Sequence, residues 1–344
     1  FEGVRLPFRV GRPSVAVPGA VAGLWAVHER YGRMPMAEVA APAVRLARQG
    51  VPMTEGQHRA FALLEPIFRR TPEAWKLIGH TDHVLEEGEA IQNEPFSDFL
   101  ATLVEEGPRG FYAGEVAARV ETVTQGFVTA EDLGAYQPAW GRPLSRRYRR
   151  VMVHTPGMPS LNGALLQVAL STLERDGEMS RFGELAYWRR IAEALRVTED
   201  VRTPSYEAQI FDAGFLEGVL ASCPGGNTMQ CSAVDSDGNA VSYTSTVGEG
   251  CGFTIPGTGV ILNNFLGEED ILPEHVEHVP GRRMMTSMCP TLVEDDTGGV
   301  LVLGAAGSAR IRSAILQVLV HVLDGALPLQ EAVLMPRIHP EGET

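Results

Sequence analysis

The spacing of apolar residues changes once along this chain, and that change limits the folds that it can adopt. Apolar residues recur at helical spacing in five segments of the first half, 20–31, 36–48, 57–70, 96–106 and 114–123. Gly32 and Gly50 follow the first two segments, where a glycine commonly ends a helix. From Met229 onward, short apolar runs bounded by turn residues indicate β-strands. Helices, then strands, then a final helix predict a layered α+β or αββα protein.

The rest of the chain completes this prediction. Further helices are expected over 164–173, 182–197 and 313–323. Further strands are expected within 148–154, 259–264, 290–295 and 299–307. The 344 residues contain no internal repeat and no low-complexity linker, so we expect one domain that covers residues 1–344.

Charge and cysteine content exclude several classes of function. The formal net charge is −14 and no segment is rich in Lys or Arg, so nucleic acids and anionic membranes are poor partners. No apolar run approaches the ~18 residues of a membrane span, and the first residues do not resemble a signal peptide. The four cysteines lack CxxC spacing, and two His-x-x-His pairs lack further ligands, so we expect no metal and no cofactor. These residues are Cys223, Cys231, Cys251, Cys289, His80, His83, His275 and His278.

The segment MQCSAVDSDGNAVSYTST, residues 229–246, predicts a β-hairpin around Ser-Asp-Gly-Asn. A turn that is symmetric about Asp237 pairs residues equally far from it, so Thr228 faces Thr246. Directly opposed residues have Cβ atoms about 4.5–5.5 Å apart, which brings the two hydroxyls within hydrogen-bond reach. A bulge at Gly238 would shift this register. A strand threonine pair usually reflects β-propensity alone, and the preceding run CPGGN suits either a backbone site that is cut or an ordinary loop.

Around this hairpin the sequence resembles the γ-glutamyltranspeptidase family, and the resemblance spans essentially the whole chain. Residues 14–50 are similar to the family's large-subunit signature. GPRGFYAGEVAARV, GFVTAEDLGAYQPAWGRPL and the turn at Pro159-Ser160 are also similar to the family. The segment that begins at Thr228 resembles the start of the small subunit, and PGTGVILNN, TSMCPTLV and GAAGSARI resemble its later blocks. Several blocks in the family's order are more specific than any single motif.

The resemblance implies an N-terminal-nucleophile hydrolase with a four-layer αββα sandwich, made as a precursor that cleaves itself between Asn227 and Thr228. Residues 1–227 would form the large-subunit part, and residues 228–344 the small-subunit part. Cleavage would expose Thr228 as the nucleophile, with its own α-amino group as the base. A threonine hydroxyl needs such an adjacent base, and an amide nitrogen cannot serve as one. A free α-amine has a pKa of about 7.7–8.0 and accepts a proton near neutral pH.

The resemblance assigns the other roles position by position. Thr246 matches the threonine that hydrogen-bonds the nucleophile, in agreement with the cross-strand pairing. Gly307 and Ser308 match the Gly-Gly pair whose backbone N–H groups form the oxyanion hole, and a backbone donor needs no particular side chain. Thr286 and Ser287 match the Ser-Ser pair that binds the α-carboxylate of the substrate.

Three departures from the family concern substrate binding. After two asparagines, the second matched by Asn264, the family has Glu or Gln and then Met-Asp-Asp, which hold the substrate's α-amino group. Here Phe265 cannot accept a hydrogen bond from an ammonium, while Glu268 matches the second acid by position, so we expect Asn264 and Glu268 to bind substrate. Gly248 replaces an asparagine of the family. The family's N-terminal segment with its Asp-Phe-Arg motif, and its last strands beyond Pro336-Arg337, have no counterpart, so we expect a chain truncated at both ends relative to the family.

We therefore expect a γ-glutamyl hydrolase or transferase. It would cleave γ-glutamyl amides such as glutathione and pass the acyl group from Thr228 to water, an amino acid or a peptide. Two alternatives stay open. Phe265 favours a related amide acylase of the cephalosporin/glutaryl or poly-γ-glutamate type, and an uncleaved, inactive relative is the other. Family members are often periplasmic or secreted, and the expected partners are a small-molecule amide, an acceptor and the two subunits from one precursor.

Overall fold

The computed structural model describes residues 8–175, 177–202, 228–269, 271–272, 279–308 and 310–340. The predicted cleavage residue Asn227 lies outside the described residues, as do Cys223, His275 and His278. The chain divides into two compact units, of which unit 1 is Phe1–Trp140 with Val247–Glu268 and unit 2 is Gly141–Thr246 with Glu269–Thr344. The single domain and the subunit boundary after Asn227 stay predictions.

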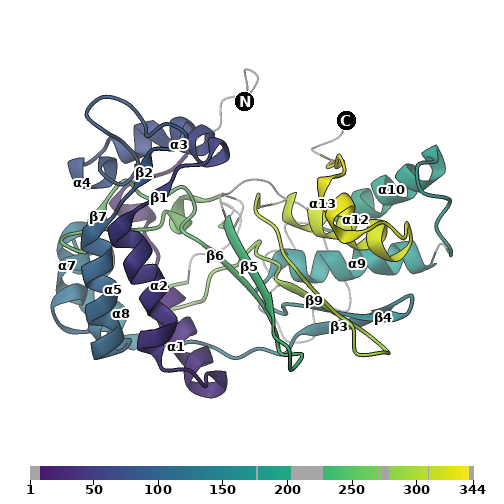
Figure 1. Ribbon diagram of the computed structural model, residues 1–344, viewed down its shortest axis with the longest axis horizontal. Coiled ribbons are helices and arrows are strands. Elements are labelled where there is room, and N and C mark those ends of the chain that lie inside the picture. Colours follow the sequence, from purple (N-terminus) through teal and green to yellow (C-terminus); the bar gives the residue numbers. More distant parts are fainter. Residues whose placement is uncertain are drawn as a thin grey trace. The chain divides into compact units, whose positions relative to one another are not determined.

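Unit 1 is mainly helical (Figure 1). Its α-helices are α1 (Ala20–Tyr31), α2 (Met36–Gln49), α3 (Glu55–Phe68), α4 (Pro72–Trp75), α5 (Glu94–Glu106), α6 (Arg109–Tyr112), α7 (Gly114–Thr124) and α8 (Ala130–Ala135). Its 3-10 turns are η1 (Arg12–Ser14) and η3 (Phe265–Gly267). Two short antiparallel pairs join β1 (Val51–Pro52) to β2 (Ala90–Ile91) and β7 (Thr254–Ile255) to β8 (Val260–Ile261).

Local capping decides where these helices begin and end. The Thr54 hydroxyl accepts the Gln57 N–H at 3.2 Å and Gln57 Oε1 accepts the Thr54 N–H at 2.9 Å, so α3 begins at Glu55, two residues before its predicted start. Asn93 caps α5, because its side chain accepts a hydrogen bond from the Phe96 N–H. Gly50 ends α2 with φ +85°, which L-residues rarely adopt. The five predicted helices are confirmed; caps at Thr54 and Asn93 explain the earlier starts of α3 and α5, and α3 ends at Phe68, two residues before its predicted end.

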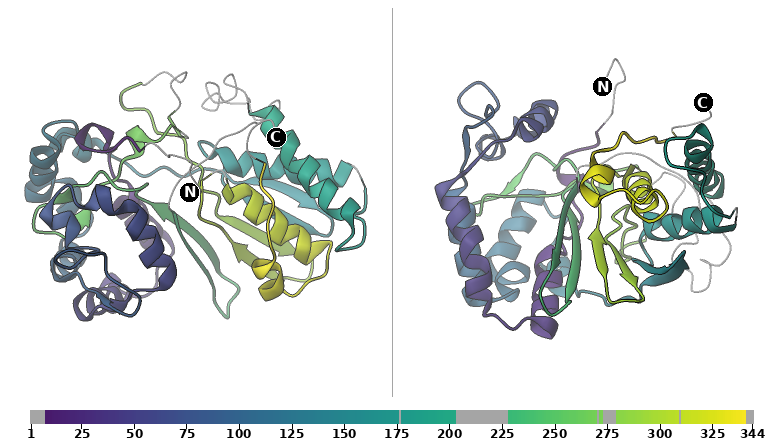
Figure 2. Two further views of the ribbon diagram at one scale, coloured as in Figure 1. Left: turned by 90° about the horizontal axis from the view of Figure 1, so that it is seen from above. Right: turned by 45° about the vertical axis from the view of Figure 1, so that its right-hand side comes forward.

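Unit 2 is built on a four-stranded antiparallel sheet with the order β10-β9-β4-β3. Its strands are β3 (Leu144–Tyr148), β4 (Val151–Thr155), β9 (Thr291–Asp295) and β10 (Val300–Leu303). The helices α9 (Leu161–Arg175), α10 (Leu185–Val201), α12 (Arg310–Leu323) and α13 (Leu329–Leu334) complete the unit, together with the hairpin of β5 (Thr228–Val234) and β6 (Ala240–Thr246) (Figure 1). The hairpin packs beside β10, as both views in Figure 2 show.

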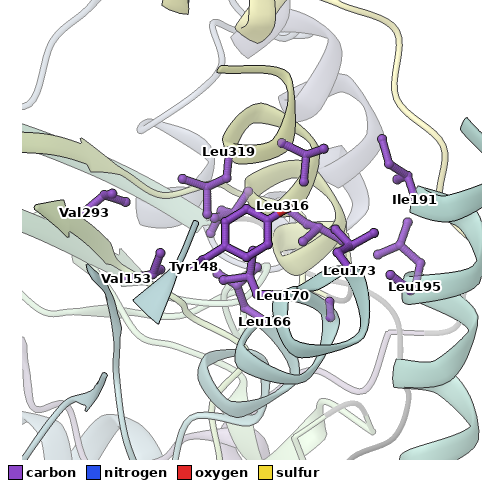
Figure 3. Close-up of a cluster of buried hydrophobic side chains, with 14 of the residues drawn as sticks. Tyr148, Val153, Leu166, Leu170, Leu173, Ile191, Leu195, Val293, Leu316 and Leu319 are labelled. Atoms are coloured by element: carbon purple, nitrogen blue, oxygen red, sulfur yellow. The ribbon is translucent and has the colours of Figure 1, made fainter. Parts of the chain in front are cut away.

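The core of unit 2 lies between this sheet and its helices (Figure 3). Tyr148 and Val153 contribute from the sheet, Leu170 from α9, Ile191 from α10 and Leu316 from α12, all fully buried. Burying one such apolar side chain stabilises a protein by about 1.5–3 kcal/mol. The cluster therefore fixes α9 and α12 against the sheet, and Gly307 and Ser308 come shortly before α12.

The single strand predicted over 148–154 is wrong. The chain turns back at Arg149-Arg150, and Tyr148 pairs directly with Val151 across a two-residue turn. Arg149 has φ +55°, and its Nε donates to Asp324 Oδ1 at 2.7 Å while the Tyr148 hydroxyl donates to Asp324 Oδ2 at 2.6 Å. Such turns usually contain Gly or Asn, so the two arginines gave no local signal. A contact with a distant carboxylate holds the turn instead.

Two other strand predictions are too long. Only Val260–Ile261 is a strand within 259–264, and only Val300–Leu303 within 299–307. The mixture of helical and antiparallel sheet elements confirms the α+β class. Among the described residues, no helix is both long and apolar enough to cross a membrane.

A buried ion pair joins α12 to α10 within unit 2. Arg312 is 1% exposed and pairs with Glu199, and burial lowers the pKa of its guanidinium to about 10. Arg312→Met should lower the free energy of unfolding by about 3–5 kcal/mol, because Glu199 would then be left without its counter-charge. Urea denaturation measures this loss.

Arg196 provides the matched control on α10. It pairs with Glu193 and Asp200 but its side chain is 56% exposed, so Arg196→Met should cost less than about 1 kcal/mol. The double variant Arg312→Met/Glu199→Met should recover part of the loss, because both charges leave together. Equal losses for Arg312→Met and Arg196→Met would contradict a buried pair.

Candidate active site

The predicted register of the β5–β6 hairpin is confirmed. Thr228 pairs with Thr246, and the pairing continues without a bulge to Val234 opposite Ala240. The Asp235 carboxylate fixes the turn, because its Oδ1 accepts the N–H groups of Asp237 at 2.9 Å and Asn239 at 2.8 Å. The two threonines are thus neighbours on one face of the hairpin, and both are partly exposed.

Polar contacts attach this hairpin to the end of β10. The Ser242 hydroxyl donates to the Leu303 carbonyl at 2.9 Å, and Gln230 Nε2 donates to Ser242 Oγ at 2.9 Å. A Cβ atom on Gly304 would lie 2.1 Å from Gln230 Oε1, so a side chain at 304 would force the Gln230 amide to move. The strand that carries Thr228 is therefore fixed next to the segment that leads from β10 to Gly307.

Gly307 and Ser308 form a sharp bend directly before α12. Their φ angles are +109° and +47°, and the second value is uncommon for a residue with a side chain. The Gly307 carbonyl accepts the Arg310 N–H at 2.9 Å, and the Ser308 carbonyl accepts the Ile311 N–H at 3.1 Å. The bend therefore lies at the positive end of the α12 dipole. Its backbone N–H groups are suited to stabilise a developing negative charge.

Thr286 and Ser287 lie in an extended segment that is held by the residues before α9. Thr286 N donates to the Pro159 carbonyl at 3.1 Å, and Leu161 N donates to the Thr286 carbonyl at 2.8 Å. The Ser160 hydroxyl donates to the Met288 carbonyl at 2.8 Å. Ser287 is 8% exposed, so this pair forms part of a packed surface rather than a free loop.

Asn162 also contacts these residues, although no local pattern in the sequence marks it. Its Nδ2 atom donates to the carbonyls of Ser287 and Ser308. These partners are 125 and 146 residues away along the chain, so only the folded structure brings them together.

Asn264 and Glu268 belong to unit 1 and surround Gly248. The Asn264 Oδ1 atom accepts the N–H groups of Glu249 at 2.9 Å and Gly250 at 3.1 Å, and its Nδ2 donates to Glu249 Oε2 at 3.1 Å. A Cβ on Gly248, whose φ is +63°, would lie 1.9 Å from Glu268 Oε1 and 2.3 Å from Asn264 Oδ1. The missing side chain at 248 thus makes room for Glu268. Contact of Asn264 and Glu268 with substrate stays a prediction.

Phe265 begins η3, and its N–H donates to Asn263 Oδ1 at 3.2 Å. The six candidate residues Thr228, Thr246, Thr286, Ser287, Gly307 and Ser308 all lie in unit 2, whereas Asn264, Phe265 and Glu268 lie in unit 1. The proposed nucleophile, its partner threonine, the oxyanion pair and the carboxylate-binding pair thus lie in unit 2, and the residues expected to bind the α-amino group lie in unit 1.

Two of the described cysteines, Cys251 and Cys289, are buried. Burial raises the pKa of the Cys251 thiol and raises that of Cys289 to about 12, so both stay protonated at neutral pH. Within the same described ranges, no three His, Cys, Asp or Glu side chains are grouped so that they can hold a metal ion.

The γ-glutamyltranspeptidase family model matches residues 5–219 and 207–343, so the chain belongs to this family, as its motifs predicted. A glutathione hydrolase proenzyme of Pseudomonas aeruginosa is 29% identical over 96% of this chain and 66% of its own length. The acylase ACY 1 proenzyme of Pseudomonas sp. (strain SE83) is 29% identical over 97% of this chain and 65% of its own length. The chain thus spans 65–66% of the length of these two relatives.

Solved structures support the fold. The cephalosporin acylase from Bacillus halodurans matches with a TM-score of 0.79 at 23% identity, over 98% of this chain and 68% of that one. The Helicobacter pylori γ-glutamyltranspeptidase matches with a TM-score of 0.51 at 26% identity, over 62% of this chain and 60% of that one. This likeness confirms the α+β sandwich class that the sequence predicted.

The contact between Gly248 and Glu268 can be tested by its effect on stability. Gly248→Ala should lower the free energy of unfolding by about 2–4 kcal/mol, because the methyl group meets Glu268 and the backbone keeps a positive φ. The matched control is Gly88→Ala in the same unit, with φ +86° and no atom within 4 Å of the added Cβ. It should cost only about 1 kcal/mol.

A Glu268→Ala background separates the two causes. There the excess loss of Gly248→Ala over Gly88→Ala should shrink, because the carboxylate that meets the methyl group is gone. An unchanged excess in a thermal or urea double-mutant cycle would contradict the contact.

Proposed function

We propose that this protein is an amidohydrolase of the γ-glutamyl hydrolase or transferase type, with Thr228 as nucleophile after cleavage of the Asn227–Thr228 bond. The observation that carries the proposal is the pairing of Thr228 with Thr246 on a hairpin attached to the end of β10, which leads to Gly307 and Ser308. Membership of the γ-glutamyltranspeptidase family supports the same assignment.

In the proposed reaction, cleavage first converts the amide nitrogen of Thr228 into a free α-amine. This amine, with a pKa of about 7.7–8.0, accepts the hydroxyl proton of Thr228 while Oγ attacks the substrate carbonyl. Thr246 lies opposite Thr228 across the strand pair, and a hydrogen bond between the two hydroxyls orients the nucleophile. The negative charge of the tetrahedral intermediate is stabilised by the N–H groups of Gly307 and Ser308, a contribution of about 3–4 kcal/mol for one such donor.

The intermediate collapses when the C–N bond breaks and the leaving amine takes the proton from the α-ammonium. The product is an ester between the acyl group and Thr228. Water or an acceptor amine then attacks this ester and gives its proton to the same α-amine; the ester C–O bond breaks, and the α-ammonium returns the proton to Oγ of Thr228. Thr286 and Ser287 are the proposed ligands of the substrate's carboxylate, and Glu268 and Asn264 those of its α-ammonium.

A second candidate is an acylase whose substrate lacks the α-amino group. Phe265 favours it, because the ring replaces a group that accepts a hydrogen bond in the family pattern. One relative is named acylase ACY 1 proenzyme, which supports the same alternative. Glu268 favours the γ-glutamyl substrate, because a carboxylate held beside Gly248 attracts an ammonium.

Thr228→Ala should abolish both cleavage and turnover, because it removes the hydroxyl that each step needs. Intact-mass analysis of the unaltered protein should show two polypeptides, the second beginning at Thr228, whereas the variant should show one. Its kcat on a γ-glutamyl anilide should fall about 10³-fold or more.

The matched control is Thr297→Ala, an exposed threonine in the turn between β9 and β10. It should keep both cleavage and turnover. Cleavage or turnover by Thr228→Ala would disprove the nucleophile. A single uncleaved and inactive chain without any substitution would instead support a binding protein.

Two anilides that differ only in the α-amino group decide the substrate class. The kcat/KM for γ-glutamyl p-nitroanilide should exceed that for glutaryl p-nitroanilide by about tenfold, because Glu268 attracts the ammonium. Phe265→Gln should raise this ratio further by supplying an acceptor, whereas Phe265→Leu should leave it unchanged. A higher kcat/KM for the glutaryl compound would establish the acylase instead.

A further inference from the structure

Asn162 lies in the first turn of α9 and is 2% exposed. Its Nδ2 atom donates to the Ser287 carbonyl at 2.6 Å and to the Ser308 carbonyl at 3.0 Å. A primary amide nitrogen has two N–H donors, so both are used. One side chain thus bridges the proposed carboxylate-binding pair and the proposed oxyanion pair.

The position of Asn162 is itself fixed by its neighbours. Gly163 N donates to Ser160 Oγ at 3.1 Å, and the Thr155 hydroxyl of β4 donates to the Gly163 carbonyl at 2.8 Å. A Cβ on Gly163 would lie 2.1 Å from the Pro156 carbonyl oxygen, so only glycine allows the backbone at 163 to pass this close to Pro156. The backbone next to Asn162 is therefore held firmly in place by its neighbours.

Ser308 needs a firmly held partner because its own backbone is strained. A left-handed φ costs about 1–2 kcal/mol for a residue with a side chain, and it persists only where neighbouring contacts hold it. The Ser308 carbonyl accepts two hydrogen bonds, one from Ile311 N within the start of α12 and one from Asn162. Asn162 is therefore a contact from outside α12 that holds the Ser308 carbonyl.

We propose that Asn162 is a positioning residue that fixes the peptide groups at Ser287 and Ser308 relative to each other. This inference rests on the proposed function of the two pairs. The alignment of oxyanion donors matters because they must lie within hydrogen-bond distance of the oxyanion of the transition state, not of the carbonyl oxygen of the bound substrate. A displacement of about 1 Å at such a site reduces the rate about 100-fold.

The test compares two buried amides on α9. Asn162→Leu removes the two hydrogen bonds at the proposed site. Gln167→Leu is the matched control, because Gln167 is 8% exposed and its Nε2 donates to the carbonyls of Leu144 and Val153 and to Thr155 Oγ1, away from Ser287 and Ser308. Both variants lose buried hydrogen bonds, so a merely structural role predicts similar effects for both.

Steady-state kinetics on the cleaved protein provides the first measurement. With γ-glutamyl p-nitroanilide, Asn162→Leu should lower kcat about 10–100-fold and raise KM, whereas Gln167→Leu should keep kcat within about threefold. With valeryl p-nitroanilide, which has no carboxylate, Asn162→Leu should lower kcat to the same extent and leave KM unchanged. A kcat for Asn162→Leu within threefold of the unaltered protein would overturn the proposal.

Amide hydrogen exchange provides a measurement that does not need turnover. Asn162→Leu should increase exchange in the segments 286–289 and 307–311, and Gln167→Leu should not. Asn162→Ser, whose shorter side chain falls short of both carbonyls, replaces the leucine variant if that does not fold. Unchanged exchange in both segments would refute the role of Asn162 whatever the activity. Activity that survives in Thr228→Ala would refute the proposed function but not this exchange pattern.

Discussion

The backbone pairing of β5 with β6 is the constraint on which the rest of the proposed chemistry depends. Side chains alternate between the two faces of a strand, so a slip of one residue would turn Thr228 to the opposite face from Thr246. The Asp235 carboxylate fixes the turn, and Ser242 fixes the position of the pair along β10. A contact within the turn thus sets the register of the threonines, and a contact between Ser242 and β10 sets the position of the hairpin beside that strand.

The departure from the family pattern at Gly248 is compensated by neighbouring residues of unit 1. Gly248 replaces a larger side chain, and the carboxylate of Glu268 and the amide of Asn264 occupy the space that a Cβ would take. Asn264 then holds the turn at Glu249 and Gly250 through three hydrogen bonds. The effect of a substitution at 248 therefore depends on the side chain at 268, because the two positions share the same space.

A structural feature could be predicted from the sequence where the contacts that determine it join residues close together along the chain. The helices near Ala20 and Met36 follow from local spacing and from the glycines that end them, and the hairpin register follows from a symmetric turn. The turn at Arg149 was missed because Asp324, far along the chain, holds it. Asn162 was missed for the same reason, since its partners lie beyond the reach of any local pattern. Family resemblance indicated the proposed oxyanion pair, but it did not indicate Asn162, which contacts the Ser308 carbonyl.

Ser308 shows why such a holding residue is needed in this chain in particular. A glycine adopts a positive φ without strain, so a Gly-Gly pair forms the bend before a helix at little cost. A serine at the second position resists the same bend, and its φ of +47° has to be maintained by contacts from outside the bend. Asn162 supplies one of them from α9, and the buried core that joins α9 to α12 keeps that contact in place. The departure from glycine at 308 is therefore tolerated because packing far from the site supports a strained backbone within it.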